Sequence, residues 1–205
     1  MIEKYYNGVI EQVAGGIGNV EHNSILVRYS NDFSIWDLES VNHYKDQTDI
    51  FFTCHEFSYN KIAEAYEPYL GLIRQMFHKY CSGTLEEFME ECDVYKLQRP
   101  VFESYFEKGF CERTEQILID EVEYEQERMR NSIVTMLQKL SEIRPVVIVL
   151  NRFQLASKST MQLSNSLLQV KNKNIGIVLG VNDVQSIPEF AHEEWDAICE
   201  RMDDR

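Results

Sequence analysis

Two uninterrupted apolar runs constrain the fold of this chain more than any other feature of its sequence. They are VVIVL, residues 146–150, and the IGIVLGV that follows Asn174 in NIGIVLGV, residues 174–181. A strand of an antiparallel sheet commonly alternates apolar and polar residues, because one face meets solvent, whereas a strand buried on both faces is apolar throughout. Both runs are therefore predicted to be inner strands of a parallel sheet that is covered by helices on both faces.

The rest of the chain supplies further strands and the helices between them. SILVRYS, residues 24–30, and DIFFTC, residues 49–54, have strand composition. Apolar residues spaced three or four apart indicate helices, which are expected over residues 2–13, 34–40, 66–80, 118–143 and 159–170, and from 188 onwards. Ser159 is the candidate N-cap of the fifth helix. Strands alternating with helices predict an α/β fold of three layers in a single domain, residues 1–205.

Charge and composition exclude several classes of protein. The formal net charge is −14, and no block of basic residues occurs. A nucleic-acid partner is therefore not expected, since phosphate binding needs clustered Lys and Arg. No window of 18 continuous apolar residues and no signal peptide is present, which predicts a cytoplasmic protein without a membrane partner. Five irregularly spaced cysteines indicate reduced thiols rather than a disulfide framework.

The order of elements around the two apolar runs is informative. A long helix leads into strand 146–150, two polar residues, a Gln-containing turn, a helix, and a second apolar strand that ends in a polar residue. This order resembles the second half of the ATPase core in signal-transducing AAA-like (STAND) proteins. FFTCHEFSYNKIAEAYEPYLGLIRQM, residues 51–76, likewise resembles the second strand and following helix of that family, and the likeness covers residues 24–182.

The resemblance implies a P-loop NTPase-like sheet with strands in the spatial order first, fourth, third, second. It also implies two acids after strand 146–150, which hold magnesium and polarise water. Asn151 and Arg152 stand at these positions, while Gln154 falls on the turn and Asn182 on the polar "sensor" after the last strand. The metal and acid positions are therefore expected to be degenerate.

The phosphate-binding loop should follow strand 24–30 with the pattern G-x-x-x-x-G-K-[ST]. Ser30 stands where the first Gly belongs, Trp36 where Lys belongs, and Asp37 where Ser or Thr belongs. We expect no binding of Mg·ATP at such a loop. Ser34 and Asp37 instead have the spacing of a helix capping box, and Trp36 is expected to fill part of the vacated volume. The Gly-rich AGGIGN, residues 14–19, precedes the strand and reads as a helix-terminating loop.

The interpretation is a non-catalytic pseudo-ATPase, a regulatory module of a signalling protein that uses no cofactor or metal and has no catalytic residue. The resemblance implies a protein partner, or downstream domains such as helical repeats and a diguanylate cyclase. We expect the chain to be part of a longer one and to lack the fifth strand of the fold. The bare edge of strand 24–30 would then favour a homodimer.

Other readings of the sequence stay open. One is a nucleotide-binding switch with unorthodox residues. Another is an unrelated α/β thiol enzyme that uses Cys54, next to His55 at a strand end. His78 and Cys81 have metal-like spacing on a helix, but no second pair is near them in sequence. The carboxylates of Glu56 and Asp183 have no partner that the sequence identifies.

Overall fold

The chain forms two compact units. The computed structural model describes residues 2–18, 23–30, 33–45, 49–61, 63–109, 122–184 and 186–204. Unit 1 comprises Met1–Glu67 and Arg144–Arg205, and unit 2 comprises Pro68–Ile143. The predicted strands all lie in unit 1, and each unit is described separately.

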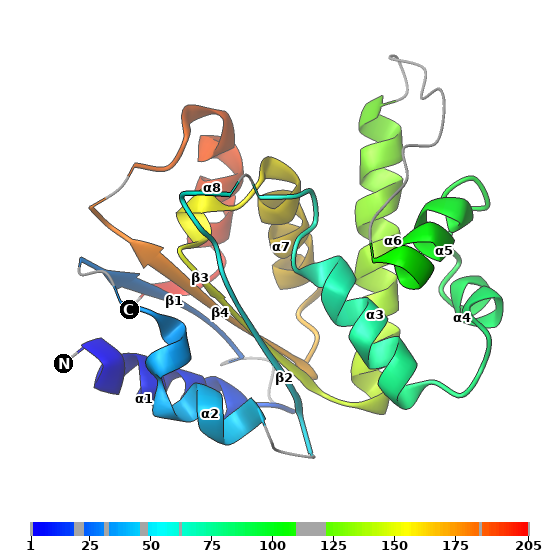
Figure 1. The fold of residues 1–205 in the computed structure, drawn as a ribbon. Coiled ribbons are helices and arrows are strands. Elements are labelled where there is room, and N and C mark those ends of the chain that lie inside the picture. The colour runs from blue at the N-terminus through cyan, green and yellow to red at the C-terminus, as the bar shows by residue number, and fades with distance from the viewer. Residues whose placement is uncertain are drawn as a thin grey trace. The chain divides into compact units, whose positions relative to one another are not determined.

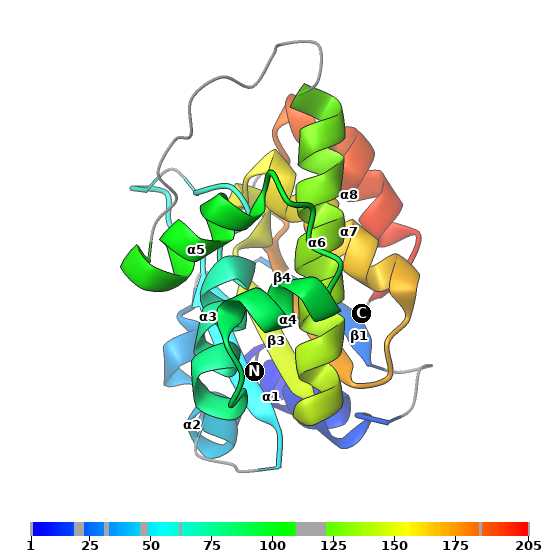
Figure 2. The ribbon, with the colours of Figure 1, turned by 90° about the vertical axis from the view of Figure 1, so that its right-hand side faces the viewer.

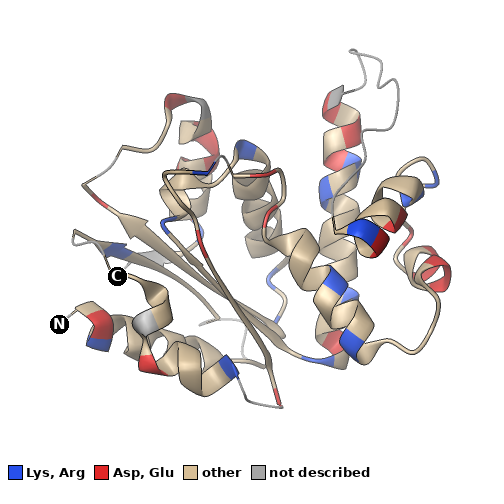
Figure 3. Cartoon of the chain, in the orientation of Figure 1, with Lys and Arg blue, Asp and Glu red and all other residues tan. Residues whose placement is uncertain are grey.

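Unit 1 is built on a parallel sheet in the order β2-β3-β4-β1-β5 (Figure 1). The four longer strands are β1 (Ser24–Tyr29), β2 (Phe51–Glu56), β3 (Val146–Asn151) and β4 (Ile175–Asn182). Their order confirms the predicted sequence of first, fourth, third, second. Every residue of β3 and β4 is buried, as expected for inner strands. Neither strand contains a charged residue, so both are tan throughout in Figure 3.

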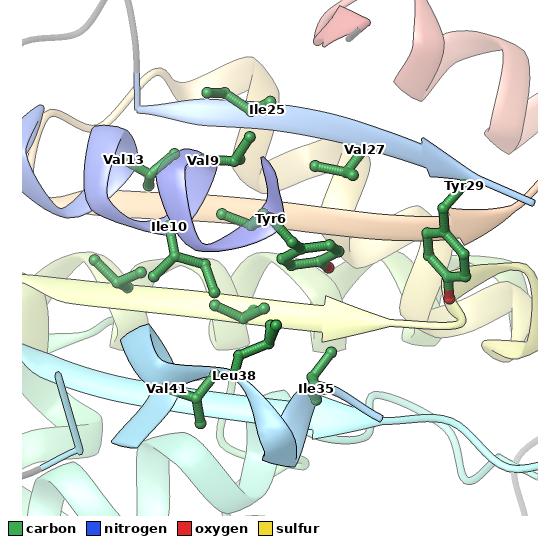
Figure 4. Close-up of a cluster of buried hydrophobic side chains, with 13 residues drawn as sticks. Tyr6, Val9, Ile10, Val13, Ile25, Val27, Tyr29, Ile35, Leu38 and Val41 are labelled. Atoms are coloured by element: carbon green, nitrogen blue, oxygen red, sulfur yellow. The ribbon is translucent and has the colours of Figure 1, made fainter. Parts of the chain in front are cut away.

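Helices cover both faces of this sheet. Helix α1 (Ile2–Gly15) and helix α2 (Glu39–Lys45) pack on one face. Helices α7 (Lys158–Val170) and α8 (His192–Cys199) lie on the opposite side in Figures 1 and 2. Figure 4 shows the core on the α1 and α2 side, whose labelled members are Tyr6, Val9, Ile10, Val13, Ile25, Val27, Tyr29, Ile35, Leu38 and Val41. The three predicted layers are therefore present.

The outer edge of β1 differs from the prediction of a bare edge. A short strand, β5 (Asp203–Asp204), pairs in parallel with β1 opposite Ile25 and Leu26. It stands on the side where a fifth strand was expected to be missing. Since β5 is only two residues long, it occupies part of the edge and leaves the four-strand order unchanged.

Two local features also differ from the sequence prediction. The helix expected from Ser34 is a 3-10 turn, η2 (Ile35–Asp37), and α2 begins only at Glu39. The N-cap of α7 is Ser157, whose side chain accepts the N–H of Thr160 at 3.2 Å, and Ser159 lies inside the helix. Two further 3-10 turns, η4 (Phe153–Leu155) and η5 (Glu189–Ala191), follow β3 and precede α8.

Unit 2 contains helices α3 (Tyr69–Tyr80), α4 (Leu85–Glu91), α5 (Arg99–Lys108) and α6 (Val122–Ile143). The aromatic ring of Phe77 packs against the rings of Phe88 and Phe106, with centroids 5.2 and 5.4 Å apart. Helix α4 begins with a complete capping box between Thr84 and Glu87. Most of the apolar stripes predicted for α3 and α6 is buried, but Ile143 at the end of the α6 stripe is 51% exposed. None of the helices described here is long and apolar enough to cross a membrane.

Candidate functional site

Polar side chains gather at the carboxyl edge of the sheet, where parallel α/β proteins bind their ligands. Strand β1 ends at Tyr29, β2 at Glu56, β3 at Asn151 and β4 at Asn182. The register places Glu56 directly opposite Asn151, and Tyr29 directly opposite Asn182. The parallel arrangement thus brings together residues that are far apart in the sequence.

The centre of the site is the carboxylate of Glu56, whose side chain is only 12% exposed. Its Oε1 lies 3.0 Å from Nη1 of Arg152. Its Oε2 accepts the backbone N–H of Ile35 at 2.9 Å, and longer hydrogen bonds from Asn151 Nδ2 at 3.4 Å and Ser34 Oγ at 3.5 Å. We call these four donor groups the Glu56 cradle. Charge-assisted hydrogen bonds of this kind are stronger than neutral ones. The cradle supplies the partners of Glu56 that the sequence did not identify.

Asn151 connects the cradle to the buried side of the sheet. Its side chain is fully buried, and its Oδ1 accepts the hydroxyl of Tyr29 at 2.8 Å while its Nδ2 faces Glu56. Burial raises the pKa of Tyr29 far above its usual range, so its hydroxyl remains a donor. Both ends of the Asn151 amide are therefore in use, and the side chain is held in one orientation.

A tight approach at Gly180 of β4 completes this polar cluster. A Cβ at Gly180 would lie 2.6 Å from Asn151 Oδ1 and closer still to the hydroxyl of Tyr6, so any side chain there would force both to move. Tyr6 is fully buried, and its hydroxyl has no hydrogen-bond partner among the described residues. Burial raises the pKa of Tyr6 well above its usual range, so this phenol is also neutral.

Arg152 occupies the second position at which the family resemblance implies an acid. Its backbone is left-handed, with φ of 53°, a conformation that a non-glycine residue adopts at a penalty of about 1–2 kcal/mol. The guanidinium lies 5.6 Å from the ring centroid of Tyr59, within the range of a cation–π contact. Arg152 thus places a fixed positive charge where a metal-binding site would need a negative one.

Gln154 and Asn182 hold the adjacent turns rather than the cradle. The buried Oε1 of Gln154 accepts the backbone N–H of Asn182 at 3.3 Å. The Oδ1 of Asn182 accepts the N–H of Val184 at 3.0 Å, which fixes the loop after β4. The "sensor" position is therefore filled by a side chain bonded to its own loop.

The four positions predicted to form a degenerate phosphate loop differ in exposure and in contacts. Ser30 is exposed. Ser34 caps the turn as predicted, but its Oγ accepts the N–H of Trp36 at 3.4 Å rather than that of Asp37. The Asp37 side chain lies outside the described residues. Trp36 is 50% exposed, so about half of its surface faces solvent. Glu56 instead accepts hydrogen bonds from the N–H of Ile35 and the hydroxyl of Ser34 in this loop.

The glycine-rich segment at residues 14–19 is described as far as Gly18. This described part lies at the opposite end of the strands from the carboxyl edge. Helix α1 ends at Gly15, and Gly18, with φ of 97°, donates its N–H to the carbonyl of Lys173 at 2.8 Å. Lys173 stands just before the start of β4. This segment therefore ends a helix, as predicted, and is remote from the carboxyl edge.

The cysteine-based alternative finds no activated thiol at Cys54. Burial raises the pKa of Cys54 to about 11, so the thiolate is scarce at neutral pH. The neighbouring His55 pairs instead with Glu67, at 4.0 Å between Nε2 and Oε1. The described residues also contain no group of three or more His, Cys, Asp or Glu side chains arranged to hold a metal, and this includes the region of His78 and Cys81.

Comparison of the sequence with models of known protein families gives no match, and comparison with curated proteins gives no significant relative. The fold class of the chain is therefore assigned from its sheet topology alone. This topology establishes an α/β fold with four parallel strands in the order 1-4-3-2 and helices packed around them.

Proposed function

We propose that the chain is a non-catalytic regulatory and interaction module of a cytoplasmic signalling protein, with a P-loop ATPase-like sheet and a degenerate nucleotide site. The observation that carries the proposal is the Glu56 carboxylate, 2.9 Å from the N–H of Ile35 in the loop after β1. ATPases of this architecture direct the N–H groups of that loop at phosphate. Here a carboxylate of the same chain accepts one, so this donor is already occupied and not offered to a phosphate.

Among the described residues, those at the carboxyl edge also do not offer the ligands of a magnesium site for hydrolysis. Magnesium takes oxygen ligands, usually one or two carboxylates together with the substrate phosphates. Asn151 supplies no charge, and its oxygen already accepts a bond from Tyr29. Glu56 is the carboxylate nearest to it, and Arg152 neutralises that charge at 3.0 Å. This arrangement supports a structural rather than a catalytic role for the site.

The resemblance to STAND proteins supplies the biological context of the proposal. In that context the module relays a signal to a protein partner, to domains further along the same chain, or to a second copy of itself. The net charge of −14 disfavours nucleic acid as the partner. The part of the β1 edge that β5 leaves unpaired offers backbone groups for a contact between copies.

The proposal is tested by thermal unfolding with Mg·ATP, Mg·ADP or magnesium alone. A ligand at one hundred times its dissociation constant stabilises a protein by about 2.7 kcal/mol, which for a chain of this size corresponds to roughly 5–10 °C in Tm. We expect no nucleotide-dependent shift. A shift of that size with Mg·ATP and not with magnesium alone would show that the site is a nucleotide-binding switch.

A further inference from the structure

The four donors around Glu56 have the geometry of a site for a carboxylate rather than of a chance salt bridge. Arg152 meets one oxygen of the group at 3.0 Å, while the N–H of Ile35 meets the other at 2.9 Å. Asn151 and Ser34 add longer bonds to that second oxygen. Donors thus converge on both oxygens of one planar anion from β3, from the turn after it and from the loop after β1.

The cradle does not depend on the Glu56 side chain to hold its backbone in place. Asn151 is held by Tyr29, and Arg152 is supported by the ring of Tyr59. The residue after Glu56 is anchored as well: the N–H of Phe57 donates to the carbonyl of Asn151 at 3.0 Å, and its ring is buried against Phe153. Shortening the side chain at position 56 should therefore remove the anion and leave its donors in place.

We propose that the Glu56 cradle is a carboxylate-binding site whose resident ligand is the chain's own Glu56, and that it binds a free carboxylate when this side chain is removed or swings away. The ligand class is a small planar carboxylate, such as a formate ion, an acetate ion or an acidic side chain. The inference rests on the proposed function in one respect only, that the cradle holds no nucleotide.

A hollow in unit 1 shares Tyr59 with the surroundings of the cradle. It has a volume of about 430 Å³ and is lined by Ser58, Tyr59, Lys61, Ala63, Leu155, Ala156, Ser157 and Lys158. Tyr59 is the residue whose ring lies against the Arg152 guanidinium. Lys61 pairs with Glu67 and Glu64, and Lys158 pairs with Glu194, so these lysines do not themselves hold the proposed ligand.

The test compares Glu56→Ala with the wild-type protein and with Glu90→Ala. Glu90 is a matched control because its Oε1 lies 3.4 Å from Nη1 of Arg99, whereas its side chain is 64% exposed and the contacts described for its carboxylate include no backbone N–H. Thermal unfolding is followed at pH 7.5 in sodium formate, acetate, phosphate or chloride of equal ionic strength. We expect formate or acetate to raise the Tm of Glu56→Ala by roughly 5–10 °C over chloride at one hundred times the dissociation constant.

The wild-type protein and Glu90→Ala should show no difference between formate and chloride. The formate shift should also be lost in the double variant Glu56→Ala with Arg152→Ala. We expect a smaller shift with phosphate, because its tetrahedral oxygens do not match donors placed for a planar group. No formate-specific shift in folded Glu56→Ala, an equal shift in Glu90→Ala, or a larger shift with phosphate would overturn the proposal.

If Glu56→Ala does not fold in chloride, the readout becomes the yield of refolding from urea in formate against chloride. Recovery in formate alone supports the site, and failure in both solutions overturns it. The Mg·ATP experiment uses the wild-type protein, and the formate experiment uses the variant. Either one can therefore fail while the other succeeds, which separates the carboxylate site from the proposed function.

Discussion

Replacing Asn151 with aspartate restores an acid at the first of the two positions where a hydrolytic ATPase of this architecture carries one. We expect the variant to lose stability rather than to gain a metal site. The Nδ2 of Asn151 lies 3.4 Å from the Oε2 of Glu56 and donates a hydrogen bond to it. An aspartate would replace this donor with a second carboxylate, in a site where the Glu56 side chain is 12% exposed.

The size of the effect follows from that distance. Two unit charges 3.4 Å apart repel by about 5 kcal/mol at an effective dielectric constant of about 20. Relaxation of the side chains and uptake of a proton reduce the net penalty, and the lost hydrogen bond adds about 1 kcal/mol. We therefore expect Asn151→Asp to lower the free energy of unfolding by about 2–4 kcal/mol at pH 7.5, within the range for a disrupted buried polar network.

Urea unfolding at pH 7.5 measures this loss, and the double variant Asn151→Asp with Glu56→Gln identifies its cause. The double variant removes one of the two like charges and restores a donor–acceptor pair. It should be more stable than Asn151→Asp alone by about 2 kcal/mol, a coupling typical of residues in direct contact. Wild-type stability in Asn151→Asp, or additive effects in the double variant, would refute the view that Glu56 and Asn151 form one unit.

Two further predictions concern the titratable groups at the end of β2. Burial lowers the pKa of His55 below its usual 6.5, so the unfolded chain takes up this proton first as the pH falls. As the pH falls, the free energy of unfolding should therefore decline between about pH 6.5 and the folded-state pKa of His55, and His55 should cause no further decline at lower pH. Urea titrations of His55→Gln should show a flatter pH dependence over this interval. An unchanged slope would contradict the assignment to His55. The pKa of Cys54 is about 11, compared with an ordinary 9.0, so its labelling by iodoacetamide at pH 7.5 should be roughly a hundredfold slower than that of an exposed thiol. Mass spectrometry of the labelled peptides measures this rate. Faster, selective labelling of Cys54 would support the alternative of a thiol enzyme.

The sheet was predictable because its strands carry their own signal. VVIVL and IGIVLGV, residues 175–181, are apolar at every position, and this pattern is typical of a strand that is covered on both faces. Their order in the sheet followed from the resemblance and from the right-handed crossover rule. Local capping was less predictable, because Ser157 and Ser159 are both suitable N-caps and they lie only two residues apart.

The Glu56 cradle was not predictable from the local sequence. The donors to Glu56 lie 21 positions before it, at Ile35, and 95 positions after it, at Asn151. The sequence signal of β2 also ended at Cys54, whereas the strand continues to Glu56. Had the strand been extended by two residues, the parallel register would have placed Glu56 opposite Asn151. The contact between Glu56 and Asn151 was therefore missed because the predicted end of β2 lay two residues too early.

The enclosed carboxylate explains how such an edge can remain stable without a ligand. Donors directed at one point are destabilising when unpaired, by about 1–3 kcal/mol for each buried group. A diffusible anion satisfies them only at concentrations above its dissociation constant, whereas Glu56 is held in place by the register of β2 against β3. The same geometry ties positions 56, 151 and 152 together. An acid at 151 would repel Glu56, and a neutral residue at 152 would leave the Glu56 carboxylate without its cation. In the proposed ATPase-like reading, the absence of the two acids and the enclosure of a glutamate are thus parts of a single change, and substituting one of the three positions alone should be destabilising.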